Sequence, residues 1–427
     1  MTVHRERRPT PEPIFPKLPG GAGAPPPDRV AAHQRARLMG AMVEGVHRSG
    51  YQQLTIRELV GLAGVSRTSF YEHFTGKEEC FLATLGEIAT RGVQWVEEGR
   101  GSAAGLPGVL ENGLRAFAEI VVAEPLAARL ALVDSLSLGP AGVPGREAAA
   151  DHFEPLITGS FAAAGRPLGR LQARWILSGW RHAAYRALRA GEPARLEAEL
   201  SELVTWALAR PDAEGVAVPS LPASVRRGQP GWSRPIRSAR TRPAPDRRPR
   251  LLQAAAQLAA ADGSAALSIP AITKRALTSN VAFYEHFDST EEALLLAFDD
   301  LCATSRGLTA TAFAAQPDWP GGVLAALAAL LLHVSREPIF ARLAFFELPA
   351  SGPGGLDRAD AGLGTLEDLL RPAAFGSSAP ALSSAARAAT VGALWAAIQQ
   401  ELAGGRASSL PGLAGRLGAL VLAPFRA

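Results

Sequence analysis

One five-residue stretch, FYEHF, occurs twice in this chain, at residues 70–74 and again at residues 283–287. A chance recurrence is improbable in a chain with only four tyrosines and eight histidines. The same offset of 213 residues (284 minus 71) applies without a gap over about a hundred residues; it pairs Gly50 with Gly263, Ser66 with Ser279, and Glu124-Pro125 with Glu337-Pro338. Because solenoid repeats have periods of only ~20–50 residues, a unit this long indicates two duplicated domains.

Length and composition place the chain among soluble proteins. A chain of 427 residues is too long for one hydrophobic core, and 47% hydrophobic with 20% charged residues is ordinary for a globular protein. Two cysteines cannot form a disulfide framework, which favours a reducing cytoplasm. The charged, Pro-rich start is not a signal peptide, and the longest apolar runs, such as residues 323–332, are too short to cross a bilayer. We therefore expect a cytoplasmic protein without a membrane partner.

Each copy begins with the signals of short helices. In copy one, Thr55 is a good N-cap for a helix over residues 56–62, and Ser66 for a second helix over residues 67–73. Between them, Gly64 can take the left-handed conformation at no steric cost. Two short helices joined by a tight turn containing glycine form a helix-turn-helix. The sequence thus predicts an all-α fold.

The segment over residues 55–81, TIRELVGLAGVSRTSFYEHFTGKEECF, resembles the DNA-binding region of TetR-family transcriptional regulators. The match runs through T-I-x-x-L, A-G-V-S, F-Y-x-H-F and K-E without an insertion, and this combination is highly specific. It covers about fifty residues of each copy closely. The resemblance implies two fused TetR-like units. Each has an N-terminal helix-turn-helix head and a helical body for ligand binding and dimerisation.

These signals divide the chain into six parts. We expect a disordered basic, Pro-rich tail (1–29), a first head (30–90), a first body (91–210), an Arg/Pro-rich linker (211–249), a degenerate second head (250–303) and a second body (304–427). The linker is expected to be disordered, because nine arginines and five prolines stand between residues 226 and 250 with one acid. Two roles stay open for it, a soluble tether or a non-specific DNA contact. Arg5, Arg7 and Arg8 of the tail allow the same choice.

The resemblance and the chemistry of the first head together give its DNA-binding residues. Arg67, Thr68 and Ser69 stand at the base-reading end of the second short helix, where an arginine can contact guanine with two hydrogen bonds. Phosphate contacts are expected from Tyr71, His73 and Lys77, and from the helix N-termini at Thr55 and Ser66. The alternative readings are a purely structural helix-turn-helix, a packed Tyr71 and a solvated His73.

The second head keeps only part of this set. Its candidates for DNA contact are Ser268, Ser279, Asn280, Tyr284 and His286, while Arg67 is replaced by Asn280 and Lys77 by Thr290. From Arg29 to Arg91 there are eight basic residues against six acids, and from Asp262 to Asp300 two against seven. Leu277 replaces Gly64, and a side chain at a left-handed turn costs roughly 1 kcal/mol. We expect the second head to bind DNA weakly.

The body of copy one offers one candidate ligand face. Trp175, Ser178, His182 and Tyr185 share one side of a predicted helix and mix aromatic with polar groups, as a small-molecule pocket does. The same face can instead pack against another body in a four-helix interface. Both interpretations stay open from the sequence.

No enzyme signature is present. The chain has no G-x-S-x-G, P-loop, H-E-x-x-H or zinc-spaced cysteines, so we expect no catalytic residue, metal or cofactor. The sequence predicts a regulator that binds a double-stranded operator, with repression and a small-molecule inducer as the family default. It acts as a single-chain pseudo-dimer or as a homodimer. The alternative is a regulator acting through protein or ligand contacts, with only its first head on DNA.

Overall fold

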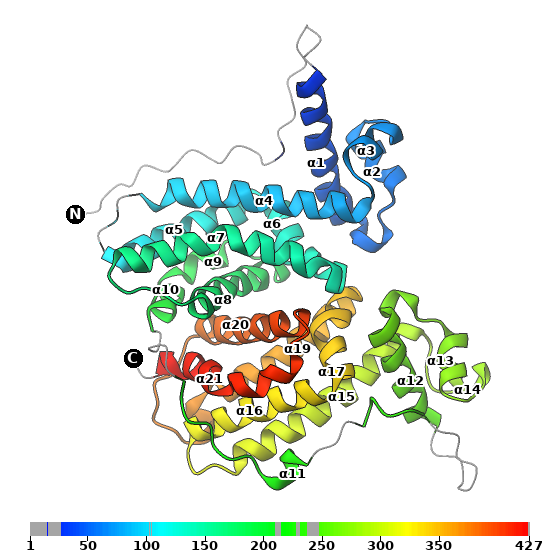
Figure 1. Cartoon of the computed structure of the whole chain (residues 1–427), viewed down its shortest axis with the longest axis vertical. Coiled ribbons are helices and arrows are strands. Elements are labelled where there is room, and N and C mark those ends of the chain that lie inside the picture. The colour runs from blue at the N-terminus through cyan, green and yellow to red at the C-terminus, as the bar shows by residue number, and fades with distance from the viewer. Residues whose placement is uncertain are drawn as a thin grey trace. The chain divides into compact units, whose positions relative to one another are not determined.

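The computed structural model describes residues 15, 27–101, 103, 105–209, 215–227, 231–236 and 247–425. Within these residues the fold is all-α and contains no strand, as predicted (Figure 1). The chain divides into two compact units, Met1–Leu208 and Ala209–Ala427. Each unit has a head followed by a helical body, which confirms the predicted duplication.

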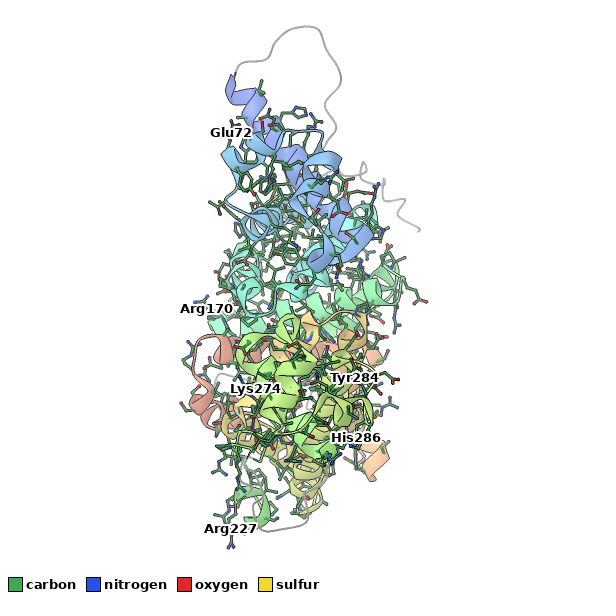
Figure 2. All side chains as sticks on the ribbon, turned by 90° about the vertical axis from the view of Figure 1, so that its right-hand side faces the viewer. Glu72, Arg170, Arg227, Lys274, Tyr284 and His286 are labelled. Carbon is green, nitrogen blue, oxygen red and sulfur yellow. The ribbon has the colours of Figure 1, made fainter. Side chains whose placement is uncertain are left out.

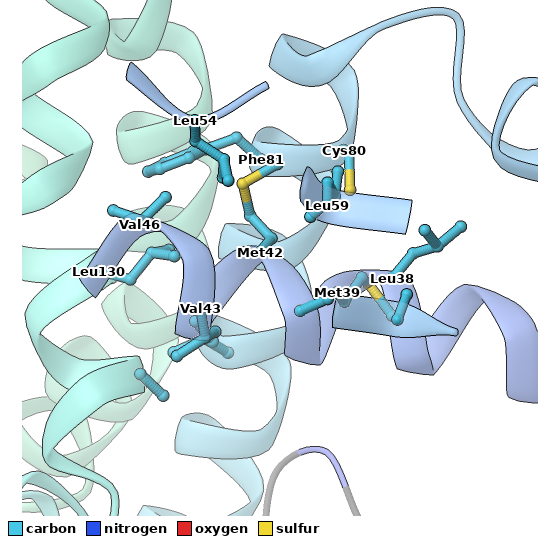
Figure 3. Packing of buried hydrophobic residues seen from close by; sticks show 14 of the residues in the cluster. Leu38, Met39, Met42, Val43, Val46, Leu54, Leu59, Cys80, Phe81 and Leu130 are labelled. Atoms are coloured by element: carbon cyan, nitrogen blue, oxygen red, sulfur yellow. The ribbon is translucent and has the colours of Figure 1, made fainter. Parts of the chain in front are cut away.

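The first head has three helices. They are α1 (Pro27–Gln53), α2 (Ile56–Ala63) and α3 (Arg67–His73), and α1 is interrupted at Gly50, whose φ is 76°. Figure 3 shows side chains of α1, among them Leu38 and Met42, beside Leu59 and Phe81 in one apolar cluster. Phe70 of α3 and Phe74, which directly follows α3, are also buried in this cluster. Burying two aromatic rings fixes a helix too short to be stable alone.

The first body is a helical bundle. Its elements are α4 (Lys77–Arg100), α5 (Gly105–Ala123), α6 (Pro125–Leu132), the 3₁₀ segment η1 (Asp134–Gly142), α7 (Val143–Ala163), α8 (Arg170–Arg189), α9 (Arg195–Ala198) and α10 (Leu200–Leu208). Helix α4 crosses the expected boundary at residue 90, so head and body share one continuous helix. A shift in the body can therefore be transmitted to the head along α4.

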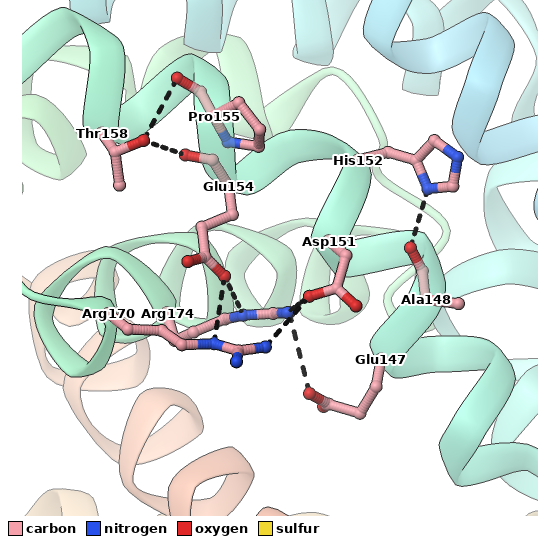
Figure 4. A network of polar contacts seen from close by, with 9 residues as sticks. All are labelled: Glu147, Ala148, Asp151, His152, Glu154, Pro155, Thr158, Arg170 and Arg174. Atoms are coloured by element: carbon pink, nitrogen blue, oxygen red, sulfur yellow. Dashed lines mark hydrogen bonds and ion pairs between the residues drawn. The ribbon is translucent and has the colours of Figure 1, made fainter.

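An ion network joins α7 to α8 (Figure 4). The Arg174 side chain is only 8% exposed, and its guanidinium contacts Glu154 at 2.6 Å, Glu147 at 3.7 Å and Asp151. Arg170 adds an exposed contact to Asp151 at 3.2 Å. A buried guanidinium must be matched by carboxylates, because an unpaired buried charge costs several kcal/mol (~3–5). The network therefore fixes the pairing of these two helices.

The second unit repeats the order of the first. Its head contains α12 (Arg247–Asp262), η2 (Ser264–Ala266), α13 (Ile269–Arg275) and α14 (Asn280–Tyr284). Its body contains α15 (Thr290–Ala314), α16 (Trp319–Arg336), α17 (Pro338–Arg342), the π-helical η3 (Leu343–Glu347), α18 (Leu348–Ala350), α19 (Pro353–Leu369), η4 (Pro372–Phe375), α20 (Ser384–Ala403), η5 (Ala407–Leu413), α21 (Ala414–Leu422) and η6 (Ala423–Phe425). Helices α13, α14, α15 and α17 each begin 213 residues after their counterparts in the first unit.

The predicted linker is packed on the second unit over its described parts. Residues 215–227 include the short helix α11 (Ala223–Arg226), and Val225 is buried against Ala312, Ala325 and Ala329. The backbone N–H of Val216 donates to the carbonyl oxygen of Gly415 at 3.1 Å. The expectation of a disordered linker over 211–249 is therefore wrong for residues 215–227. The physical reason is that Val225 packs against a surface of alanine side chains on the second unit.

Residues 231–236, which we call the strap, are hydrogen-bonded to side chains of the second unit. The carboxylate of Glu337 accepts hydrogen bonds from the backbone N–H of Trp232, at 3.3 Å, and from the hydroxyl of Ser233. The side-chain amides of Gln253 and Gln257 donate to strap carbonyl oxygens at 2.8–3.2 Å. These donors and acceptors replace the water that a disordered segment would bind.

In the part of the chain that the structure describes, two helical stretches are long and apolar enough by composition to cross a membrane, Pro125–Ala163 and Trp319–Arg336. The first comprises α6, η1 and α7 rather than one straight helix. The second is α16, whose apolar window is 67% buried inside the structure, as expected for a core helix.

Candidate nucleic-acid interface

Helix α3 has one buried and one exposed face. Phe70 is buried, whereas Arg67, Thr68 and Tyr71 are exposed on the other side. The Arg67 guanidinium lies 5.7 Å from the centre of the Tyr71 ring, a distance at which the ring attracts the cation. The exposed face therefore presents one oriented arginine with hydroxyl groups beside it, and these can donate to base edges in a major groove. Ser69 is half-buried.

The N-termini of α2 and α3 are capped as the sequence predicted. The Thr55 hydroxyl accepts from the Glu58 backbone N–H at 3.2 Å, and the Glu58 carboxylate accepts from the Thr55 N–H at 2.8 Å. These hydrogen bonds hold the pKa of Glu58 below its usual value. The Ser66 hydroxyl accepts from the Ser69 N–H at 2.9 Å. Both capping hydroxyls are thus engaged, so a phosphate would meet the remaining backbone N–H groups of these first turns.

The turn between α2 and α3 depends on Gly64. Its φ is 59°, in the left-handed region that the sequence predicted. The Arg37 guanidinium donates to the Gly64 carbonyl oxygen at 3.1 Å and also lies where a Cβ at Gly64 would project. Sequence reasoning missed Arg37, because no local pattern links it to a turn 27 residues away.

Lys77 has a structural role that the sequence did not indicate. Its ammonium group donates to the carbonyl oxygens of Tyr51 at 2.7 Å, Leu54 at 2.8 Å and Gln52 at 3.4 Å. It also lies 4.3 Å from the centre of the Tyr51 ring, and burial lowers its pKa. These contacts tie the start of α4 to the end of α1. The predicted phosphate contact of Lys77 would have to compete with them.

Two further residues of the first head, Tyr71 and His73, were predicted to contact phosphates. Tyr71 is 48% exposed and therefore is not a packed core aromatic. His73 is half-buried, and its Nε2 lies 3.4 Å from Oε1 of Gln34 on α1. Contact of these two residues with DNA stays a prediction.

The second head keeps the scaffold with altered contacts. Ser279 caps α14 by accepting from the Ala282 N–H at 3.3 Å, whereas Ser268 makes no side-chain cap to α13. The Asn280 side-chain oxygen accepts from the Thr273 hydroxyl at 2.7 Å. This bond engages one of the two groups with which an asparagine reads adenine. Leu277 takes a φ of 54°, so the predicted strain at this turn is present.

Three large apolar side chains are exposed on α14 and on the turn before it. Val281 is 70% exposed, Tyr284 62% and Leu277 50%, whereas Ala282 and Phe283 are buried. Tyr284 and His286 are labelled on this head in Figure 2, and His286 is half-buried. Sequence reasoning missed Val281, although the offset of 213 already pairs it with Thr68.

The difference in net charge between the two heads is smaller when stretches of equal length are compared. The stretch equivalent to residues 29–91 is 242–304, which has six basic residues and eight acids, a balance of −2 rather than −5. The extra cations include Arg247, Arg248 and Arg250. Arg248 lies 5.9 Å from the centre of the Phe287 ring, just as Arg35 lies 4.6 Å from that of Phe74. Over these equivalent stretches the second head still carries the lower charge, −2 against +2.

The first body contains an apolar cavity of about 110 Å³. Its walls come from α4, α5, α6, α7 and α8, and include Leu110, Phe117, Phe153, Leu177 and Trp180. Arg100 supplies a polar end, where its guanidinium donates to the Ser160 hydroxyl at 2.8 Å.

The residues predicted to form a ligand pocket do not line this cavity. Trp175, Ser178, His182 and Tyr185 lie elsewhere on α8, whose contributions to the cavity are Leu177, Trp180 and Arg181. The rings of His182 and Tyr185 stack on each other at 5.4 Å, and burial lowers the pKa of His182 to about 3. Ligand contact by these four residues stays a prediction, and their packing within the body stays the alternative.

Two regions of the chain, residues 44–84 and 251–297, match the sequence profile of bacterial regulatory proteins of the tetR family. No significant match was found among curated proteins. Solved structures that are similar include the fatty acid degradation regulator FadR from Bacillus halodurans, with 15% identity, a TM-score of 0.38, and coverage of 41% of this chain and 94% of that one. FadR from Bacillus subtilis in complex with stearoyl-CoA has 15% identity and a TM-score of 0.36, covering 39% and 96%. A TetR-like regulator from Rhodococcus sp. RHA1 has 17% identity and a TM-score of 0.35, covering 42% and 97%.

Proposed function

We propose that this chain is a regulator of the tetR family that represses transcription by binding an operator through two unequal heads; each unit contains one region that matches the family profile. The exposed face of α3 supports this proposal most directly. Arg67, Thr68 and Tyr71 project from a helix whose opposite face is anchored by Phe70. The site of action is the cytoplasm, where the operator lies.

The mechanism follows from this geometry. Helix α3 enters the major groove, and Arg67 donates two hydrogen bonds to O6 and N7 of a guanine. The first turns of α2 and α3 present backbone N–H groups to phosphates, and Tyr71 at the rim adds a hydroxyl. A protein placed in this way on a promoter excludes the polymerase, which is repression.

The test is a selection of bound duplexes from a random pool by the full chain, followed by competition at several salt concentrations. We expect a recurring sequence with a guanine in one half, and loss of preference at that guanine in Arg67→Ala. Arg91→Ala is the matched control, because Arg91 is an exposed arginine on α4 that pairs with Glu87 at 3.1 Å. If the wild-type chain selects no sequence, the proposal is wrong.

We further propose that one chain supplies both heads as a pseudo-dimer. The support is the duplication of head and body within one polypeptide. The alternative is a homodimer of tandem chains with four heads. Sedimentation at nanomolar concentration distinguishes them, because a stable two-chain particle would contradict the pseudo-dimer.

The cavity of the first body is the best-supported site for an inducer. Its walls are mostly apolar, and Arg100, Arg181 and Glu124 also line it, so the favoured ligand is a small, largely apolar molecule with an anionic or hydrogen-bond-accepting group for the guanidinium groups. A ligand that moves α4 changes the position of the first head, because α4 belongs to both. Thermal-shift measurements with short aliphatic and aromatic carboxylates test this. Stabilisation that is lost in Arg100→Gln is expected, and an equal shift in both proteins would contradict it.

A further inference from the structure

The base-reading positions of the two heads carry different chemistry. The first head presents Arg67 and Thr68 at the start of α3, and the second presents Asn280 and Val281 at the start of α14. Val281 is more exposed than any other large hydrophobic residue among the described ones. Of the eight that are exposed, three lie together at this turn and helix, at positions 277, 281 and 284. Such a cluster marks a contact surface rather than a scattered exposure.

Cations, rather than acids, border this apolar surface on the α13 side. Lys274 and Arg275 are exposed at the end of α13, just before Leu277, where the first head has Gly61 and Leu62. Lys274 is labelled in Figure 2. Glu285, an exposed acid directly after α14, pairs with Arg247 at 3.3 Å. The exposed Ser268 hydroxyl at the start of α13 makes no cap. Positive charge and an exposed hydroxyl around an apolar centre complement phosphates around a groove, so the surface fits DNA better than a protein partner.

We propose that the second head is a reader of thymine, with Val281 in contact with the C5-methyl group. In the major groove, thymine alone presents a methyl group, and it does so beside its O4 acceptor. The Asn280 side-chain oxygen is held by Thr273, which leaves its NH₂ group to donate to an acceptor such as O4. The half-site under the second head therefore contains thymine at the position facing Val281, whereas the half-site under the first head contains guanine.

This inference rests on the proposed function, since it requires an operator. The test begins with a duplex selected by the full chain, in which the half sensitive to Arg67→Ala is assigned to the first head. Each thymine is then replaced by deoxyuridine, which removes only the methyl group. We expect one position in the other half to lose about four-fold in affinity, the value for one buried methyl at ~0.8 kcal/mol.

Substitutions of Val281 test whether this side chain contacts the methyl group at the uracil-sensitive position. In Val281→Ser the uracil effect should vanish at this position alone, and in Val281→Ile it should persist. Thr68→Ala in the first head is the matched control and should leave the effect unchanged. Val281 is exposed, so these changes leave the core of the head intact.

Three results would overturn the inference while leaving the proposed function in place. The first is a selected operator in which no thymine outside the Arg67 half is sensitive to uracil. The second is a uracil effect that survives Val281→Ser. The third is a Val281→Ser protein whose DNA binding is unchanged but whose self-association is lost, which would make the surface a protein interface. Failure to select any sequence would instead defeat the proposed function itself.

Discussion

The two heads share the buried aromatic anchors of the second short helix and differ elsewhere. Phe70 and Phe283 are both fully buried, Phe74 and Phe287 nearly so, and Gly50 and Gly263 both take positive φ, at 76° and 87°. Surface changes include the positions of Gly64, Arg67 and Thr68, and interior changes include Ala255 in place of Met42 and Leu294 in place of Phe81. The anchoring rings were retained after duplication, because loss of a buried ring costs several kcal/mol (~3–5). Other interior positions accepted smaller side chains, and the exposed face acquired a different chemistry.

The largest expected effect tests whether the cores are equivalent. Phe70→Ala and Phe283→Ala should each cost about 3–5 kcal/mol of local stability, because each removes a buried ring that anchors a short helix. Amide hydrogen exchange reports each head separately. Exposure of only the mutated head, to a similar extent in both variants, is expected. A much smaller cost in the second head would show that its core is already loosened.

The next effect tests whether affinity is concentrated in the first head. Arg67→Ala should cost about 1–3 kcal/mol in specific binding and relax the preference for one base. Asn280→Ala should cost less, because its oxygen already accepts from Thr273. Titration of a selected operator measures both. Equal losses would mean that the two heads contribute equally.

A smaller effect concerns Lys77, which the second head replaces with Thr290. Lys77→Met should destabilise the first head by about 1–2 kcal/mol, because three backbone carbonyl oxygens lose their donor. The salt dependence of DNA binding should stay nearly unchanged, whereas a phosphate contact would reduce the slope by about one. Thr290→Ala is the matched control. A flattened slope with unchanged stability would restore the phosphate role predicted from the sequence.

The smallest expected change in stability comes from substitutions at the turn between the two short helices of each head. Leu277→Gly should stabilise the second head by about 1 kcal/mol, since glycine removes the strain at a φ of 54°. Gly64→Ala should destabilise the first head by at least as much, because the new Cβ also meets the Arg37 guanidinium. Thermal unfolding of the two variants should shift in opposite directions. A shift in the same direction would show that the two turns are not equivalent.

Local patterns made much of the fold predictable. The cap at Thr55, the left-handed turn at Gly64 and the burial of Phe70 each depend on neighbours within a few residues or on the repeated motif. The contacts of Lys77 and Arg37 were not predictable, since their partners are 23–27 residues away. Which face of α8 lines the cavity was not predictable for a similar reason: Trp175 and Trp180 stand on different faces of this helix, and only packing places Trp180 at the cavity.

The strap determines which residues a fragment of the second unit must include in order to fold. Glu337 is only 1% exposed, and within the described structure its carboxylate receives hydrogen bonds from Trp232 and Ser233. A fragment starting at Leu251, where the match to the family profile starts, would leave this carboxylate without those donors and would uncover the alanine surface under Val225. A fragment starting at Gly215 retains both contacts. The second unit as a foldable piece therefore begins before its family-profile match, and the arginine-rich stretch is in part a component of its fold.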